Sequence, residues 1–96
     1  MPDLTIFYAN VRNFLARRDE LEARLLLFPS LPSLVCLTET HLDESCAHPS
    51  LSGYTLIARR DRNIHGGGVA VFVLDELSDV VVPIRRSAVA ERREFG

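Results

Sequence analysis

Two polar residues follow apolar segments of the chain, and their types suit metal chemistry. Glu39 comes shortly after the apolar run of residues 34–37, and Asn10 directly follows the apolar and aromatic run of residues 4–9. A carboxylate and an amide oxygen are hard ligands, and Mg²⁺ binds such oxygens through few protein groups while it keeps several waters. The competing interpretation is that Asn10 is a turn residue that caps a helix and that Glu39 is a solvated strand end.

The chain between these two residues has the pattern of a strand-helix-strand unit. Residues 4–9 are rich in β-branched and aromatic side chains and predict a strand. Residues 13–28 predict a helix that Pro29 ends, with one apolar face formed by Phe14, Leu21, Leu25 and Phe28. Residues 34–37 predict a buried strand. We therefore expect two parallel neighbouring strands joined by a crossover helix, with Asn10 and Glu39 at one edge of the sheet.

The second half of the chain predicts further strands. Residues 41–52 predict a polar loop, residues 63–68 a turn with three successive glycines, and residues 75–79 a tight connection. Strands are predicted at residues 54–60, 69–74 and 80–84, the last two as a hairpin or meander. Residues 85–96 are charged and lack a closing apolar element, so we expect residues 1–96 to be the amino-terminal part of one larger domain.

Composition excludes several classes of protein. The chain has 96 residues, 47% of them hydrophobic and 25% charged, which is typical of a globular protein and not of a disordered tail. Its formal net charge of −2 gives no global attraction to nucleic acid or anionic lipid. The two cysteines fit neither a disulfide framework nor a zinc spacing. No segment is apolar enough for a membrane helix and no signal peptide begins the chain, so we expect an intracellular protein.

Four motifs occur in order along the chain and together resemble one superfamily. They are YANVRN at residues 8–13, LVCLTETHL at 34–42, GYTLIARRDRN at 53–63 and GGGVAVFV at 66–73. In this order and at these distances they are similar to the exonuclease-endonuclease-phosphatase superfamily, above all to the apurinic-type endonuclease domains of non-LTR retrotransposons. The resemblance implies an α/β fold, a four-layered sandwich of two β-sheets with helices outside, of which this chain carries part. It also implies a hydrolase of phosphate esters, with Mg²⁺ or Mn²⁺ as cofactor, DNA as partner and, at the level of the family, action in the nucleus.

The resemblance implies roles for individual residues. Glu39 matches the metal-ligand glutamate of the superfamily, and Asn10 matches the asparagine that helps to organise the metal and the phosphate, so Asn10 is both a catalytic and a metal-binding candidate. Arg12 stands where some relatives carry aspartate, and Arg12, Arg59 and Arg62 are candidate contacts for nucleic-acid phosphates. For the arginines of residues 59–62, the alternative is a solvated strand end that Asp61 balances.

The chain departs from the superfamily pattern in one decisive respect. After the four motifs the superfamily carries an Asp-x-Asn motif, a second-sheet aspartate and a late Asp-His pair, and none of these follows residue 73 here, so we expect the chain alone to lack a general base and to be inactive. The alternatives are a non-catalytic remnant, a small binding module, or a phosphatase-type member that acts on a phosphorylated small molecule. An incomplete sandwich is also expected to expose apolar strand residues.

Three further features of the sequence receive structural interpretations. Residues 66–68 do not form a P-loop, because no helix with a Lys-Ser/Thr pair follows them, and they predict a turn that leads into the next strand. Thr40 and His41 flank Glu39 and are expected to be structural, and Tyr54 is expected to belong to the core.

Overall fold

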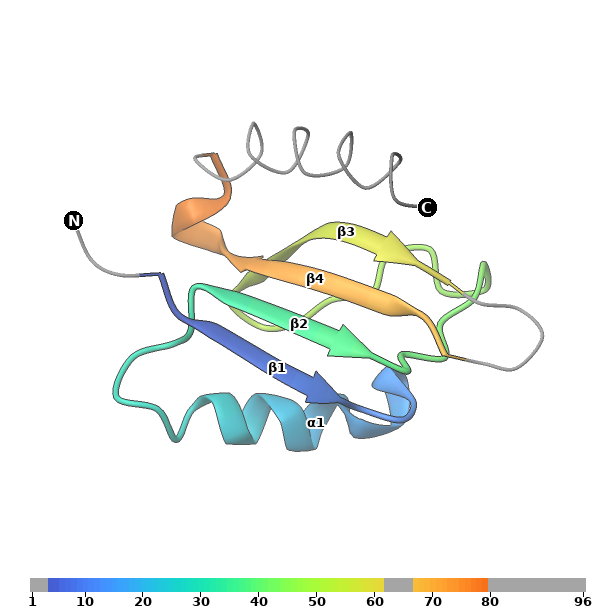
Figure 1. The fold of residues 1–96 in the computed structure, drawn as a ribbon, viewed down its shortest axis with the longest axis horizontal. Helices are drawn as coiled ribbons and strands as arrows, with labels where there is room; N and C mark the ends of the chain where they lie inside the picture. The colour runs from blue at the N-terminus through green and yellow to red at the C-terminus, as the bar shows by residue number, and fades with distance from the viewer. Residues whose placement is uncertain (1–3, 62–66, 80–96) are drawn as a thin grey trace.

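The computed structural model describes residues 4–61 and 67–79, which form a four-stranded sheet and one α-helix (Figure 1). The elements in chain order are β1 (Ile6–Asn10), α1 (Phe14–Leu25), β2 (Leu34–Thr38), β3 (Tyr54–Arg60), β4 (Val69–Leu74) and the short 3-10 helix η1 (Asp75–Leu77). The strands lie in the order β1-β2-β4-β3, with β1 and β2 parallel and the other neighbours antiparallel. The described residues thus have an α+β fold with a mixed sheet.

The predicted strand-helix-strand unit is confirmed. β1 and β2 pair in parallel from Ile6 opposite Leu34 to Asn10 opposite Thr38, and α1 connects them. A parallel pair needs such a crossover, because the chain must return to the same end of the sheet before the second strand begins. Both strands consequently end at the same edge of the sheet, which Figure 1 shows beside the start of α1.

The core packs α1 against the sheet. Phe14, Leu21 and Leu25 are the buried side chains of the helix, at helical spacing. Phe14 is fully buried and stacks on Phe72 of β4, with 5.7 Å between the ring centroids. The cluster also includes buried side chains from the strands and loops, namely Val11, Val35, Leu37, Leu42, Leu51, Tyr54 and Ala70. Because each large apolar side chain contributes roughly 1.5–3 kcal/mol when buried, this cluster is a main source of stability.

The prediction for the end of the helix is wrong. α1 ends at Leu25 and not at residue 28. Leu26 and Leu27 are 75% and 84% exposed, so no apolar contact favours a longer helix. Phe28, which its spacing assigned to the apolar face of the helix, lies beyond the helix and packs edge-on against Phe7 of β1, with 5.9 Å between the ring centroids.

The strand boundaries follow the sequence pattern closely. β3 and β4 have the predicted bounds, β1 begins at Ile6 and not at residue 4, and β2 ends at Thr38 and not at residue 37. Thr5, just before β1, and Ser33, just before β2, form two reciprocal hydrogen bonds. Thr5 donates its N–H to Ser33 Oγ over 3.1 Å, and Ser33 donates its N–H to Thr5 Oγ1 over 3.0 Å. This reciprocal pair closes the parallel ladder at its amino-terminal end.

The segment after β4 is helical at its start, where the sequence predicts a tight connection. It begins with η1, whose Asp75 donates its N–H to the Gly53 carbonyl over 3.0 Å and accepts at Oδ1 from the Thr55 hydroxyl over 2.6 Å. These bonds tie the start of η1 to the start of β3. The strand predicted at residues 80–84, the charged residues 85–96 and most of the turn predicted at residues 63–68 lie outside the described residues.

β1 is an edge strand of the described sheet and carries exposed apolar side chains. Ile6 and Tyr8 are 63% and 67% exposed, and Leu4 just before the strand is 60% exposed. Alternate residues of a strand point to opposite faces of a sheet. These side chains therefore share the face opposite to Phe7 and Ala9, which pack against the core. Exposed apolar strand residues were expected from the sequence.

Candidate functional site

Asn10 and Glu39 meet at the carboxyl ends of β1 and β2, and we call residues 10–14 and 38–41 the rim. Asn10 ends β1 opposite Thr38, so Glu39 is the next residue along the adjacent chain. Asn10 donates from its side-chain Nδ2 to Oε2 of Glu39 over 2.5 Å. Asn10 is exposed and Glu39 is half-buried. The predicted juxtaposition is confirmed, whereas metal binding and catalysis by the pair stay predictions.

The backbone of the rim is strained. Within the described residues, left-handed φ angles outside glycine occur at Arg12 (48°), Asn13 (96°), Glu39 (53°) and His41 (54°). All of these residues belong to the rim. A left-handed conformation costs an L-residue about 1–2 kcal/mol, although asparagine tolerates it better. Strain of this kind persists where the surroundings fix the backbone, and it gathers at active sites and ligand-binding sites.

Hydrogen bonds from the start of α1 fix this backbone. The N–H groups of Asn13 and Phe14 donate to the carbonyls of Glu39 and Thr40, each over 2.8 Å. The first N–H groups of a helix have no partner within the helix, and here the end of β2 supplies one. Asn13 is also the N-cap, since its Oδ1 accepts from the N–H of Ala16 over 3.2 Å. The helix-cap role considered for Asn10 therefore belongs to Asn13.

Thr40 and His41, which belong to the rim, connect it to the glycines that precede β4. Thr40 donates its N–H to the Gly68 carbonyl over 3.4 Å, and His41 donates to the Gly67 carbonyl over 2.8 Å. Thr40 is completely buried, while His41 is exposed. Gly67 and Gly68 have φ angles of 85° and 97°, which glycine adopts without strain. The geometry agrees with a turn that leads into β4.

The donor atoms of the pair fit a hard cation. Glu39 accepts from Asn10 at one carboxylate oxygen, so its other oxygen and the amide oxygen of Asn10 are the groups that could coordinate a metal. Mg²⁺ takes oxygen ligands and often only one or two carboxylates, whereas structural Zn²⁺ takes four nitrogen or sulfur ligands. Within residues 4–61 and 67–79, no group of three or more His, Cys, Asp or Glu side chains could hold a metal ion.

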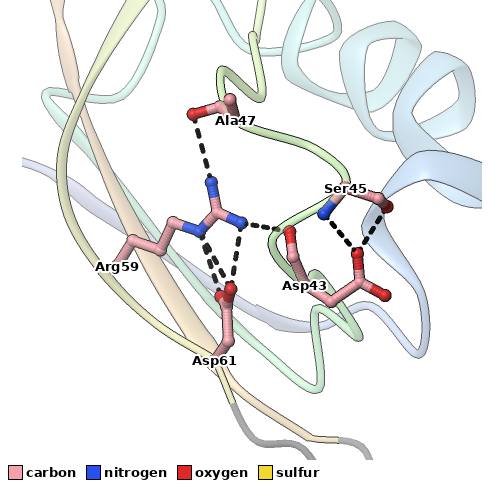
Figure 2. Close-up of polar contacts among 5 residues, drawn as sticks. All are labelled: Asp43, Ser45, Ala47, Arg59 and Asp61. Atoms are coloured by element: carbon pink, nitrogen blue, oxygen red, sulfur yellow. Dashed lines mark hydrogen bonds and ion pairs between the residues drawn. The ribbon is translucent and has the colours of Figure 1, made fainter.

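Arg59 takes part in a local polar cluster. Figure 2 shows its guanidinium between Asp61 and the loop that follows β2. Nε and Nη2 donate to the Asp61 carboxylate over 3.0 and 2.9 Å, Nη2 also donates to the Asp43 carbonyl over 2.7 Å, and Nη1 donates to the Ala47 carbonyl over 3.3 Å. The hydrogen bond to Asp61 raises the pKa of Arg59 above its ordinary value. The geometry supports the alternative in which Asp61 balances Arg59, and contact with nucleic acid stays a prediction.

The loop that Arg59 contacts is ordered by a second set of bonds (Figure 2). The Asp43 carboxylate accepts from the N–H of Ser45 over 2.9 Å and from the Ser45 hydroxyl over 2.5 Å. These bonds lower the pKa of Asp43 below its ordinary value. Arg59 therefore fastens a preformed turn to the end of β3, a role that its place in the sequence did not reveal.

The two other predicted phosphate contacts lie differently. Arg12 is exposed and belongs to the rim, two positions after Asn10. Arg62 lies outside the described residues. Of the three predicted arginines, Arg12 is therefore the one that the described structure places in the rim.

A groove beside the rim was not predicted from the sequence. It has a volume of about 180 Å³, lies between β1 and α1, and has Asn10 in its lining. Arg17 and Arg24 also line it, and each lies near the Glu20 carboxylate, at 3.6 and 3.7 Å. Exposed ion pairs of this kind are weak. The spacing of seven between the two arginines, which marks one helix face, is the signal that could have identified this groove.

Tyr54 belongs to the core, as predicted. It is 8% exposed, and its hydroxyl donates to the carbonyl of Pro32 over 2.6 Å. Burial raises the pKa of Tyr54 above its ordinary value. A base-stacking role would need an exposed ring, which this geometry does not offer.

Comparison with known proteins assigns no family to the chain. A scan of protein-family models and searches of curated proteins and of solved structures found no match. Of the helices in the described part of the chain, none has both the length and the apolar character to cross a membrane. The function proposed below therefore depends on the geometry of the rim and on the motifs in the sequence.

Proposed function

We propose that this chain provides part of a divalent-metal-dependent phosphodiesterase site that acts on nucleic acid. The observation that carries the proposal is the hydrogen bond from Asn10 to Glu39 across the ends of two parallel strands. A carboxylate and an amide held together at such an edge are suitable oxygen donors for Mg²⁺ or Mn²⁺. The strained backbone at the same place supports a site whose geometry serves ligand binding.

Three residues of the rim have distinct tasks in this proposal. Glu39 holds the cation through its carboxylate, and Asn10 orients that carboxylate by donating to Oε2, as groups beside metal ligands commonly do. Arg12, exposed in the rim, binds a backbone phosphate of the nucleic acid. A bound divalent cation polarises a phosphoryl oxygen and stabilises the leaving oxygen. One carboxylate and one amide are few ligands, so we expect weak metal binding and no hydrolysis by the chain alone.

We further propose that the fold is part of the four-layered sandwich of the exonuclease-endonuclease-phosphatase type. Support comes from the crossover unit, from the mixed sheet and from the apolar face at β1. Ile6 and Tyr8 are large side chains and are more than half exposed on that face. A second sheet packed on it would bury them, as in two sheets that pack face to face.

Metal-dependent binding of DNA tests the proposed function. Fluorescence anisotropy of a labelled duplex is measured with Mg²⁺, with Mn²⁺ and with EDTA, for the unaltered chain, for Glu39→Gln and for Glu44→Gln. Glu44 is a matched control because it is an exposed glutamate in the loop after β2. We expect the metal to strengthen binding in the unaltered chain and in Glu44→Gln, and to have little effect in Glu39→Gln.

Three outcomes would oppose this proposal. An equal effect of the metal in Glu39→Gln would remove Glu39 from the metal site. The unaltered chain could also lose DNA binding when a phosphorylated sugar is added, at concentrations at which inorganic phosphate has no effect. That result would favour the phosphatase alternative. The absence of any metal effect would favour a remnant without metal chemistry.

A further inference from the structure

Glu39 lies between two fixed points of the backbone. Its carbonyl accepts from the N–H of Asn13 over 2.8 Å, and the next residue, Thr40, donates its N–H to the Gly68 carbonyl over 3.4 Å. The first bond ties the segment after β2 to the N-cap of α1, and the second ties it to the residue just before β4. Because Glu39 is held in a left-handed conformation between these points, a shift of Thr40 against Gly68 would redirect the carboxylate that contacts Asn10.

The contact between Thr40 and Gly68 leaves no room for a side chain at Gly68. A Cβ atom there would lie 2.9 Å from Thr40 Oγ1 and 3.1 Å from the carbonyl oxygen of Arg60. Both distances are shorter than the roughly 3.5–4.0 Å at which non-bonded heavy atoms attract each other best. The φ angle of 97° would also strain any residue other than glycine. Glycine is therefore needed here for both its conformation and its size.

The contact depends on shape and not on a hydrogen bond from the threonine side chain. Thr40 is fully buried, and its Oγ1 has no hydrogen-bond partner among the residues that the structure describes. A buried hydroxyl without a hydrogen-bond partner is unfavourable for folding. The hydroxyl therefore does not stabilise the position of the Thr40 side chain. The side chain instead fills the space beside Gly68, and valine, which has nearly the same shape and is only slightly larger, should fill it without displacing Gly68.

We propose that Thr40 and Gly68 are positioning residues that aim the Glu39 carboxylate at Asn10. This inference rests on the proposed function, since it concerns the same metal-holding acid. The two residues touch neither the cation nor the phosphate, and they act through the backbone of Glu39. Gly68, the last glycine of the Gly-Gly-Gly motif, then has a task at the rim beyond forming a turn.

The test compares four variants in the full chain by NMR of the ¹⁵N-labelled protein. Gly68→Ala overfills the contact and Thr40→Ala empties it, whereas Thr40→Val preserves its shape. Gly53→Ala is the matched control, because Gly53 has a φ angle of 84° but a Cβ there would meet, among the described residues, only Leu31, at an ordinary 3.5 Å. The first measurement is the resonance of the Asn10 side-chain amide without metal, and the second is the affinity for Mn²⁺.

The expected result separates positioning from general destabilisation. Gly68→Ala and Gly53→Ala should both unfold at lower denaturant concentration. Gly68→Ala and Thr40→Ala should move the Asn10 side-chain amide resonance and weaken Mn²⁺ binding about tenfold or more, as loss of groups that support a metal ligand typically does. Gly53→Ala and Thr40→Val should leave both measurements unchanged.

The inference would be overturned if folded Thr40→Ala, or folded Gly68→Ala, kept the wild-type Asn10 resonance. Thr40→Ala provides the test if Gly68→Ala does not fold. A chain that binds no Mn²⁺ in any form would refute the proposed function, while the metal-free resonances would still decide whether the contact positions Glu39.

Discussion

Replacement of Thr40 by valine is expected to stabilise the protein, because it removes a buried hydroxyl that has no partner in the described residues. Thr40 is completely buried and its Oγ1 forms no hydrogen bond there. Valine has nearly the same shape and places a methyl group where the hydroxyl lies. The substitution therefore changes the polarity of the site and leaves the backbone bonds of Thr40 to Gly68 and Phe14 in place.

The expected gain can be worked out from two contributions. A buried polar group without a partner costs about 1–3 kcal/mol. A methyl group is slightly larger than a hydroxyl, and overpacking beside Gly68 offsets part of this gain, since extra volume in a packed core is unfavourable. We expect a net increase of about 1 kcal/mol in the free energy of unfolding, which for a domain of this size raises Tm by about 4–8 °C.

Urea unfolding followed by circular dichroism measures this effect. Thr38→Val is the control, because Thr38 is half-buried and lies two positions earlier, at the end of β2, and its change should stay within about 0.5 kcal/mol, as for most accessible sites. A lower stability of Thr40→Val, with an unchanged slope of the unfolding curve, would refute the reasoning. That result would mean that the hydroxyl has a partner and contributes to the fold.

Three other outcomes are expected. Tyr54→Phe should lower the free energy of unfolding by about 1–2 kcal/mol in urea, because the buried Pro32 carbonyl loses its donor, and an unchanged stability would contradict this. The hydrogen bonds from Ser45 lower the pKa of Asp43 in the folded protein. They therefore stabilise the turn at pH values above the ordinary aspartate pKa of about 3.9, and this stabilisation is lost as the pH falls through the lower folded pKa. NMR titration of the Ser45 amide should therefore have a midpoint below about 3.9, and a midpoint above it would be inconsistent with these bonds. Arg59→Gln should increase amide hydrogen exchange in residues 43–47 and leave β1 protected, whereas uniform acceleration would point to global unfolding.

Much of the fold follows from local patterns in the sequence. The bounds of β3 and β4 match the prediction because Gly and charged residues flank their apolar runs. The crossover follows from the order of two strands and one helix. The end of α1 could not be predicted, because Phe28 continues the helical spacing and its actual contact, with Phe7, comes from another part of the chain.

The candidate site was predictable in its members but not in its geometry. Parallel strands joined by a crossover bring their carboxyl ends together, so the meeting of Asn10 and Glu39 followed from topology. The left-handed backbone of Glu39 depends on bonds to α1 and β4, which no local pattern reveals. The partners of Arg59 likewise come from a loop more than ten residues away, except for Asp61 nearby.

The central claim is that Asn10 and Glu39 form a site for a divalent cation, and paramagnetic NMR with Mn²⁺ tests it most directly. The account predicts that small additions of Mn²⁺ broaden the Asn10 side-chain amide and the Glu39 backbone amide first, that excess Mg²⁺ reverses this, and that Glu39→Gln abolishes it. Broadening that begins instead at Asp43 and Asp61, and that persists in Glu39→Gln, would contradict the claim.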